Sequence, residues 1–215
     1  MGFSEDTPME AAWRDARIAR IYEGTNEINR MICIGMLIKK AMKGHVDLLG
    51  PAMKVQEELM GIPSFDTPDF SAPLSQEKAI IKNLKKVFLM VAGAGIQKFG
   101  PKIEEHQQLM LHAADILIEI YMAESAILRT EKNILRSSAE EQKHQIKMSQ
   151  LYLYNAVEVI SKSAKSGIIS FAEGDEQRMM LMGLKRFTKY TNYPNVAELR
   201  NSIAEQVNKE NAYCF

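Results

Sequence analysis

A regular stripe of apolar residues in the middle of the chain is the feature that most constrains the fold. Its spacing is four, three, four, three and four, through Leu109, Ala113, Ile116, Ile120, Ala123 and Ile127. Because an α-helix turns once every 3.6 residues, these side chains share one face of a helix. Other segments repeat this spacing, and none shows the sustained alternation of a β-strand. The sequence therefore predicts an all-α protein built as antiparallel helical bundles.

Start and stop signals divide the first part of the chain into helices. Thr7 and Glu10 have the spacing of a capping box and predict a helix over residues 8–21. Gly24 breaks that helix, and Thr25 can cap a second one that runs to about residue 43. Glu23 is thus expected in the loop between these two helices.

A proline-rich stretch separates the two parts of the chain. Residues 46–60 predict a third helix, and residues 61–75 contain Pro63, Pro68 and Pro73, which favour a linker. We expect three units: residues 1–43 as terminal helices of one domain, residues 44–75 as connector and linker, and residues 76–215 as a helical bundle.

The second part of the chain has the signals of four or five further helices. Ser75 can cap a helix that ends near Phe99, where Gly100 and Pro101 stop it. Three more features predict later boundaries, namely a capping box at Ser138 and Glu141, a break at Gly174 before a Met-rich helix over 176–190, and a cap at Asn195.

Composition narrows the classes of partner and the compartment. Lys and Arg (27) balance Asp and Glu (27), so no strong positive field would recruit nucleic acid, and any membrane contact would be peripheral. The longest apolar run, residues 87–96, is far shorter than the roughly 18 residues of a membrane span. Cys33 and Cys214 lie far apart, which is typical of a reducing compartment. Residues 1–20 lack a leader pattern. We expect a cytoplasmic protein.

One ordered segment points to chemistry. From Arg14 to Asn29 the chain reads Arg-Asp-Ala-Arg-Ile-Ala-Arg-Ile-Tyr-Glu-Gly-Thr-Asn-Glu-Ile-Asn. A lone loop glutamate is usually an exposed carboxylate with no special role. Here Glu23 is joined to a glycine and a threonine between two amphipathic helices, which favours a functional turn.

This segment, over about residues 2–30, closely resembles the acyl-CoA dehydrogenase signature. The resemblance implies an FAD-dependent enzyme of fatty-acid β-oxidation that removes hydrogen from the α- and β-carbons of an acyl-CoA thioester. Glu23 would be the catalytic base, since a carboxylate in a dry apolar site becomes a stronger base. Gly24 would leave room for the substrate thioester beside the backbone N–H of Glu23. Thr25 and Glu27 match positions that touch FAD in relatives.

Two departures from the family pattern refine this interpretation. Glu27 replaces a common glutamine, and a carboxylate near a pyrophosphate would need a screening partner. Gly35 falls where short- and medium-chain members often have an arginine. The chain instead resembles very-long-chain and bacterial extended members, whose extension packs across a homodimer. The family also implies an electron-transfer flavoprotein as partner.

Other candidate sites have weaker signals. Arg14, Asp15 and Arg17 favour helix-surface ion pairs over a cofactor contact. Glu141 and His144 have the spacing of a di-iron motif, but no second copy accompanies them, so we predict no metal site.

The sequence leaves two hypotheses. In the first, the chain is the C-terminal part of an acyl-CoA dehydrogenase and is inactive alone, because the family's flavin pocket lies mostly in domains that this sequence lacks. In the second, it is a free-standing helical interaction or oligomerisation module that retains the motif as a relic.

Overall fold

The computed structural model describes residues 3–61 and 70–212, and within these ranges every regular element is a helix. Pro63, Pro68 and Cys214 lie outside the described residues. The predicted all-α class is therefore confirmed. In chain order the elements are α1 (Pro8–Ile18), α2 (Asn26–Met42), α3 (Leu49–Met60), α4 (Ser75–Phe99), the 3-10 helix η1 (Gly100–Glu105), α5 (Gln107–Arg136), α6 (Lys143–Phe171), α7 (Gly174–Phe187) and α8 (Val196–Glu210).

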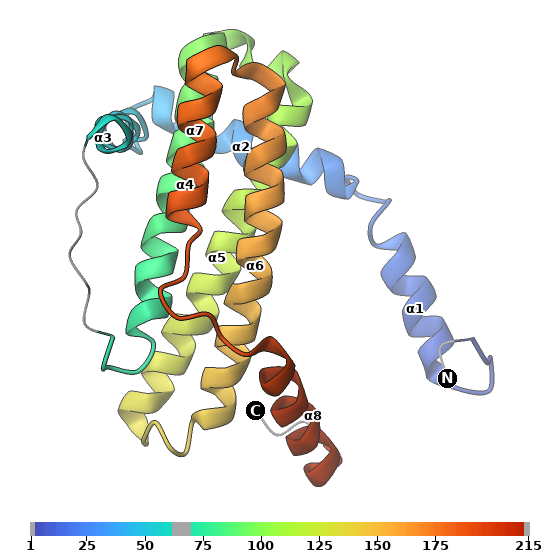
Figure 1. The fold of residues 1–215 in the computed structure, drawn as a ribbon. Helices are drawn as coiled ribbons and strands as arrows, with labels where there is room; N and C mark the ends of the chain where they lie inside the picture. Colours follow the sequence, from blue (N-terminus) through green and yellow to red (C-terminus); the bar gives the residue numbers. More distant parts are fainter. Residues whose placement is uncertain (1–2, 62–69, 213–215) are drawn as a thin grey trace.

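Four helices, α4 to α7, form an antiparallel bundle (Figure 1). The apolar stripe of α5 faces its centre as predicted, and none of its six side chains is more than 4% exposed. From α6, Leu153, Ile160 and Ala164 pack against it with no exposed surface. Short turns join successive helices, so each helix lies beside its neighbour in sequence. Helix α8 packs on α6, and its Leu199 is buried.

The core extends from this bundle to helices that precede the proline-rich stretch. Ile34 and Ile38 of α2 and Val55 of α3 are buried in the same cluster as α4 to α7. Helix α2 packs on α5, and α3 lies across α4 and α7 (Figure 1). The division of the chain at residues 43 and 75 stays a prediction.

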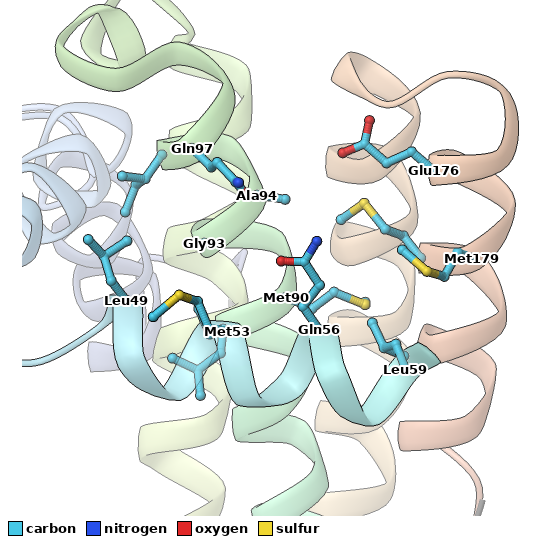
Figure 2. Close-up of a pocket in the computed structure, with 14 residues that line it drawn as sticks. Leu49, Met53, Gln56, Leu59, Met90, Gly93, Ala94, Gln97, Glu176 and Met179 are labelled. Carbon is cyan, nitrogen blue, oxygen red and sulfur yellow. The ribbon is translucent and has the colours of Figure 1, made fainter. Parts of the chain in front are cut away.

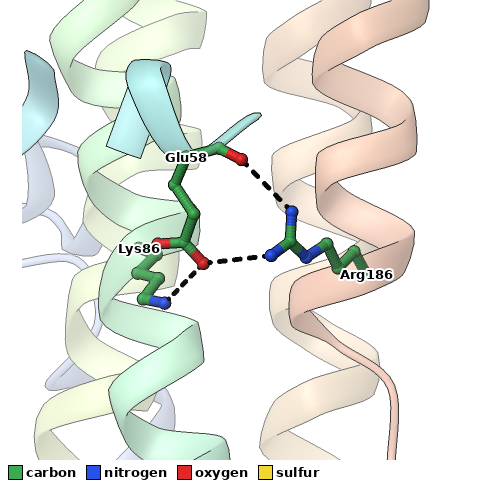
Figure 3. A network of polar contacts seen from close by, with 3 residues as sticks. All are labelled: Glu58, Lys86 and Arg186. Carbon is green, nitrogen blue, oxygen red and sulfur yellow. Dashed lines mark hydrogen bonds and ion pairs between the residues drawn. The ribbon is translucent and has the colours of Figure 1, made fainter. Parts of the chain in front are cut away.

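A cluster of charged side chains, which we call the α3 clasp, ties the end of α3 to the bundle (Figure 3). Glu58 Oε1 lies 2.8 Å from Lys86 Nζ of α4 and 3.4 Å from Arg186 Nη2 of α7. Arg186 Nη1 also donates to the Glu58 carbonyl oxygen at 3.3 Å. One carboxylate thus joins three helices, and all three side chains are about one-quarter to one-third exposed.

The predicted helix starts have mixed outcomes. Two caps are confirmed, because the Ile28 N–H donates to Thr25 Oγ1 and the Glu198 N–H donates to Asn195 Oδ1, each at 3.2 Å. The capping box at Thr7 is wrong. No side-chain cap bond forms there.

Three further boundary predictions are wrong in detail. Ser75 is the first residue of α4 instead of its cap, since its hydroxyl donates to the Ala72 carbonyl at 2.7 Å. The Ser138 hydroxyl does accept the Glu141 N–H at 3.2 Å, but this pair closes a turn and α6 begins only at Lys143. Helix α1 stops at Ile18, three residues earlier than expected.

No helix in the described part of the chain has both the length and the apolar character that crossing a bilayer requires.

Candidate active site

The segment that joins α1 to α2 carries nearly all of the predicted site residues. It runs over residues 19–25, between Ile18 and Asn26, and Glu27 follows in the first turn of α2. Helix α1 buries none of its residues, and it stands away from the bundle (Figure 1). Helix α2, in contrast, is fixed on α5 by Ile34 and Ile38. The turn is therefore anchored to the bundle from its C-terminal side.

The chain changes direction in this turn at two consecutive residues with positive φ (Figure 1). Glu23 has φ 54° and Gly24 has φ 95°. A left-handed conformation is strained for a residue with a Cβ atom, so Glu23 is held there by its surroundings. The Tyr22 N–H donates to the Ile18 carbonyl and the Asn26 N–H to the Arg20 carbonyl, both at 3.3 Å, which closes the turn at both ends.

Asn29 holds the turn from the first part of α2, a role that the motif alone did not predict. Its Nδ2 donates to the Gly24 carbonyl oxygen at 3.0 Å. A Cβ atom on Gly24 would lie 2.8 Å from Asn29 Oδ1, so the Asn29 side chain would have to shift. Position 24 thus favours glycine for its φ, and a larger residue there would also disturb Asn29. The sequence signal that could have indicated this contact is a polar residue, Asn29, in the first part of a helix and five positions after the glycine of the turn.

The first turn of α2 is satisfied by its own side chains. Thr25 accepts from the Ile28 N–H, and the pKa of Glu27 lies below its ordinary value. The main cause is a hydrogen bond from the backbone N–H of Glu27 itself, followed by one from the Thr25 hydroxyl, with smaller effects of Arg30 and Arg20. Glu27 is accordingly ionised at neutral pH.

These contacts determine which chemical group of a ligand the N-terminus of α2 could bind. A free helix N-terminus attracts phosphate, but here a carboxylate already occupies it. Arg30 and Arg20 supply the positive charge that a carboxylate near a pyrophosphate needs, although Arg30 is also paired with Asp115 at 2.8 Å. An ionised Glu27 fits a hydroxyl donor better than a phosphate. The ribityl and ribose hydroxyls of FAD are such donors.

The Glu23 side chain is exposed in this chain, and so are several apolar side chains near it in sequence. Each of the following is about half exposed: Ile18, Ile21, Tyr22, Ile28 and Ile32. Exposed apolar side chains in such number are typical of a segment that packs against other protein.

The structure gives a physical reason for Gly35. This residue is buried on the face of α2 that packs on α5, and a Cβ atom there would lie 3.9 Å from Met110 Cε. A side chain as long as arginine would have to displace Met110 of α5. The helical extension therefore accounts for the absence of a long side chain at position 35, because it covers the position.

The weaker candidates stay apart from this turn. Arg14 pairs with Glu10 at 3.2 Å on the exposed surface of α1, which agrees with a surface ion pair. Glu141 and His144 belong to the α5–α6 turn and the start of α6. Over residues 3–61 and 70–212, no three His, Cys, Asp or Glu side chains gather closely enough to hold a metal ion.

Family models match two regions of the chain, residues 1–37 and residues 83–186, and both describe the acyl-CoA dehydrogenase C-terminal domain. A probable acyl-CoA dehydrogenase of Bacillus subtilis (strain 168) is 40% identical over 203 residues, which cover 94% of this chain. The crystal structure of an acyl-CoA dehydrogenase complexed with FAD, from Bacillus anthracis, superposes on all of the chain with a TM-score of 0.93 and 38% identity. The chain belongs to the acyl-CoA dehydrogenase family.

This acyl-CoA dehydrogenase chain spans about a third of its Bacillus relatives, 34% of the B. subtilis protein and 36% of the B. anthracis chain. The short-chain specific mitochondrial enzyme of Bos taurus matches differently. It is 51% identical over 39 residues, which cover 18% of this chain and 10% of the bovine protein. The Bacillus proteins thus share the helical bundle as well as the turn.

Proposed function

We propose that this chain is the C-terminal part of an FAD-dependent acyl-CoA dehydrogenase and supplies its catalytic base, Glu23. The observation that carries the proposal is the turn itself. A non-glycine residue held at φ 54° between two helices, and flanked in sequence by exposed apolar side chains, has the features of a strained functional residue awaiting a covering surface.

The Glu23 carboxylate would accept the proton from the α-carbon of the acyl-CoA thioester. Covering the turn would exclude water and strengthen the carboxylate as a base. The backbone N–H of Glu23 would donate to the thioester oxygen as negative charge develops there, and Gly24 leaves the space for that approach. Bound FAD would accept the hydride that leaves the β-carbon.

Thr25 and Glu27 would position the cofactor. Glu27 is the better placed of the two to accept a cofactor hydroxyl, because its carboxylate is ionised and near the surface. Thr25 keeps its main role as the cap of α2 and orients Glu27.

The remaining expectations extend the same proposal. The acyl-CoA substrate, a homodimeric assembly and electron-transfer flavoprotein as electron acceptor come from the family resemblance, and a cytoplasmic location comes from the composition. A free-standing module with a relic motif is less favoured, since the B. subtilis similarity runs through both the turn and the bundle.

The test uses the gene product that contains this chain, with and without Glu23→Gln. We expect the purified wild-type protein to be yellow and to oxidise acyl-CoA in the presence of an artificial electron acceptor. Glu23→Gln should retain flavin and lose turnover by a factor on the order of 100 or more, as for loss of a general base. Glu5→Gln, on the exposed N-terminal segment, is the matched control. Unchanged turnover in Glu23→Gln would exclude the proposed role.

A further inference from the structure

A cavity lies in the helical extension, where α3 crosses α4 and α7 (Figure 2). Its volume is about 390 Å³, within the range of roughly 300–1,000 Å³ that small-molecule sites occupy. We call it the α3 trough. None of its lining residues comes from the α1–α2 turn, so binding in the trough does not depend on the role of Glu23.

Small residues bring the backbones together around the trough. A Cβ atom on Gly93 of α4 would lie 2.7 Å from the Cβ of Ala52 on α3. A Cβ atom on Gly183 of α7 would overlap the Cδ2 atom of Leu59. Helix α3 is thus seated closely on both neighbours, and the α3 clasp holds its end (Figure 3). The trough is a fixed feature of how these helices pack.

The lining is mostly apolar and adaptable. Four methionines contribute to it, Met53 from α3, Met90 from α4, and Met179 and Met180 from α7. Unbranched thioether side chains adjust to ligands of different shape, so methionine-rich surfaces suit apolar molecules of varied outline. Met53 is 59% exposed, which leaves the trough open on one side.

The polar groups of the trough are few and have a definite character. In Figure 2, Gln56 points from α3 into the space between α4 and α7, and Gln97 lies at the edge on α4. Neither amide forms a hydrogen bond with another described residue. Glu176 on α7 is the charged side chain of the lining, and it is exposed. The trough offers amide donors and acceptors together with a negative charge.

We propose that the α3 trough binds an elongated, uncharged apolar molecule that carries one hydroxyl or amide group. The apolar part lies along the methionines, and the polar group exchanges hydrogen bonds with Gln56 or Gln97. A fatty carboxylate is disfavoured, because its charge would lie near that of Glu176. This ligand class is indicated by the combination of small volume, apolar lining and a negative rim.

The first experiment measures access to the trough. N-phenyl-naphthylamine, an uncharged dye that fluoresces in apolar sites, is titrated into the protein and displaced with decanol. Ala94→Phe fills the trough and should weaken decanol binding by about tenfold or more. A loss of this size is expected if only two methylene groups of decanol are no longer buried in the trough. Met182→Phe places the same ring on the outer face of α7, where Met182 is 74% exposed, and should leave binding unchanged. Met53→Glu at the open rim is a second disrupting variant that keeps the core intact.

The second experiment tests the ligand class. Decanoate should displace the dye several-fold less well than decanol, and Glu176→Gln should remove most of that difference. Glu173→Gln, just before α7, is the matched control. The proposal is overturned if decanol fails to displace the dye, if Ala94→Phe and Met182→Phe behave alike, or if decanoate binds as well as decanol. A further result would also overturn the proposal. If the wild-type protein excludes the dye, and light scattering gives twice the mass of one chain for the wild type but the mass of one chain for Ala94→Phe, the trough is occupied by a second copy of the chain.

Discussion

Gly24 combines two requirements that are separate elsewhere in the chain. Its φ of 95° strains any other residue, and a Cβ atom there would also displace the Asn29 side chain, whereas Gly44 has φ 71° and nothing within 4 Å of a built Cβ atom. Gly44→Ala should therefore cost only the left-handed backbone penalty of about 1 kcal/mol, and Gly24→Ala should cost more. Hydrogen exchange at the Asn26 and His45 amides, each bonded within its own turn, measures the two losses. Equal losses would mean that the Asn29 contact contributes nothing.

The surroundings of Tyr152 predict that the stability of the protein depends on pH in the alkaline range. Burial, and secondarily the charge of Glu119 and the hydrogen bond to it at 3.1 Å, raise the pKa of Tyr152 to about 12. The unfolded phenol has a pKa of about 10, so the folded state favours the neutral form. The neutral Tyr152 side chain therefore makes its full contribution to the free energy of unfolding below pH ~10, and this contribution is lost as the pH rises toward 12.

Thermal unfolding of wild type and Tyr152→Phe across this range tests the prediction. Below pH ~10 the wild type should be the more stable protein, by about 1 kcal/mol, the net contribution of a typical intramolecular hydrogen bond. The difference should shrink as the pH approaches 12. A difference that stays constant with pH would contradict the assigned cause.

At the scale of elements, α3 depends on the α3 clasp for its position. Glu58→Ala removes the carboxylate that separates two cations and leaves Lys86 and Arg186 facing each other. Because these side chains are partly exposed, we expect a loss of about 1 kcal/mol. The exposed pair of Lys143 and Glu140, at 3.0 Å, is the control, and Lys143→Ala should change stability by less than about 0.5 kcal/mol. Urea unfolding of both variants gives the comparison, and similar small effects would show that the clasp is dispensable.

At the scale of the whole molecule, one core holds α2 to α7 together. Ile116 in the middle of α5 has no exposed surface, whereas Leu135 near the end of the same helix is 82% exposed. Ile116→Ala should destabilise the protein by about 2–5 kcal/mol, and Leu135→Ala by less than about 0.5 kcal/mol. Circular dichroism melts of the two variants test this contrast. Comparable melting temperatures would contradict the assignment of a single shared core.

Helix packing was predictable from the sequence wherever periodicity was strong. The α5 stripe, the Thr25 and Asn195 caps and the stop at Gly100 depend on local geometry that the sequence specifies directly. Ser75 and Ser138 failed as caps because their hydroxyls bond within the turns that lead into α4 and α6, and these bonds depend on the loop conformation. Asn29 was missed because its partner is a backbone oxygen whose position depends on two left-handed residues.

The candidate site was recognisable by its motif, but its surroundings were not. Periodicity does not say that α5 covers Gly35, or that Arg20 lies near Glu27, since both facts depend on how helices cross in space. The α3 trough was equally hidden, because it is lined by residues from three separate helices.

Helix α1 buries no residue, so its packing adds almost nothing to the stability of the bundle or of the turn that follows it. Amino-acid substitutions in this chain should therefore divide into two kinds. Substitutions in the core would reduce how many molecules survive cellular quality control while each survivor stays competent. Substitutions of exposed side chains between α1 and α2, such as Glu23, would leave the number of molecules normal and, under the proposed function, impair every one of them.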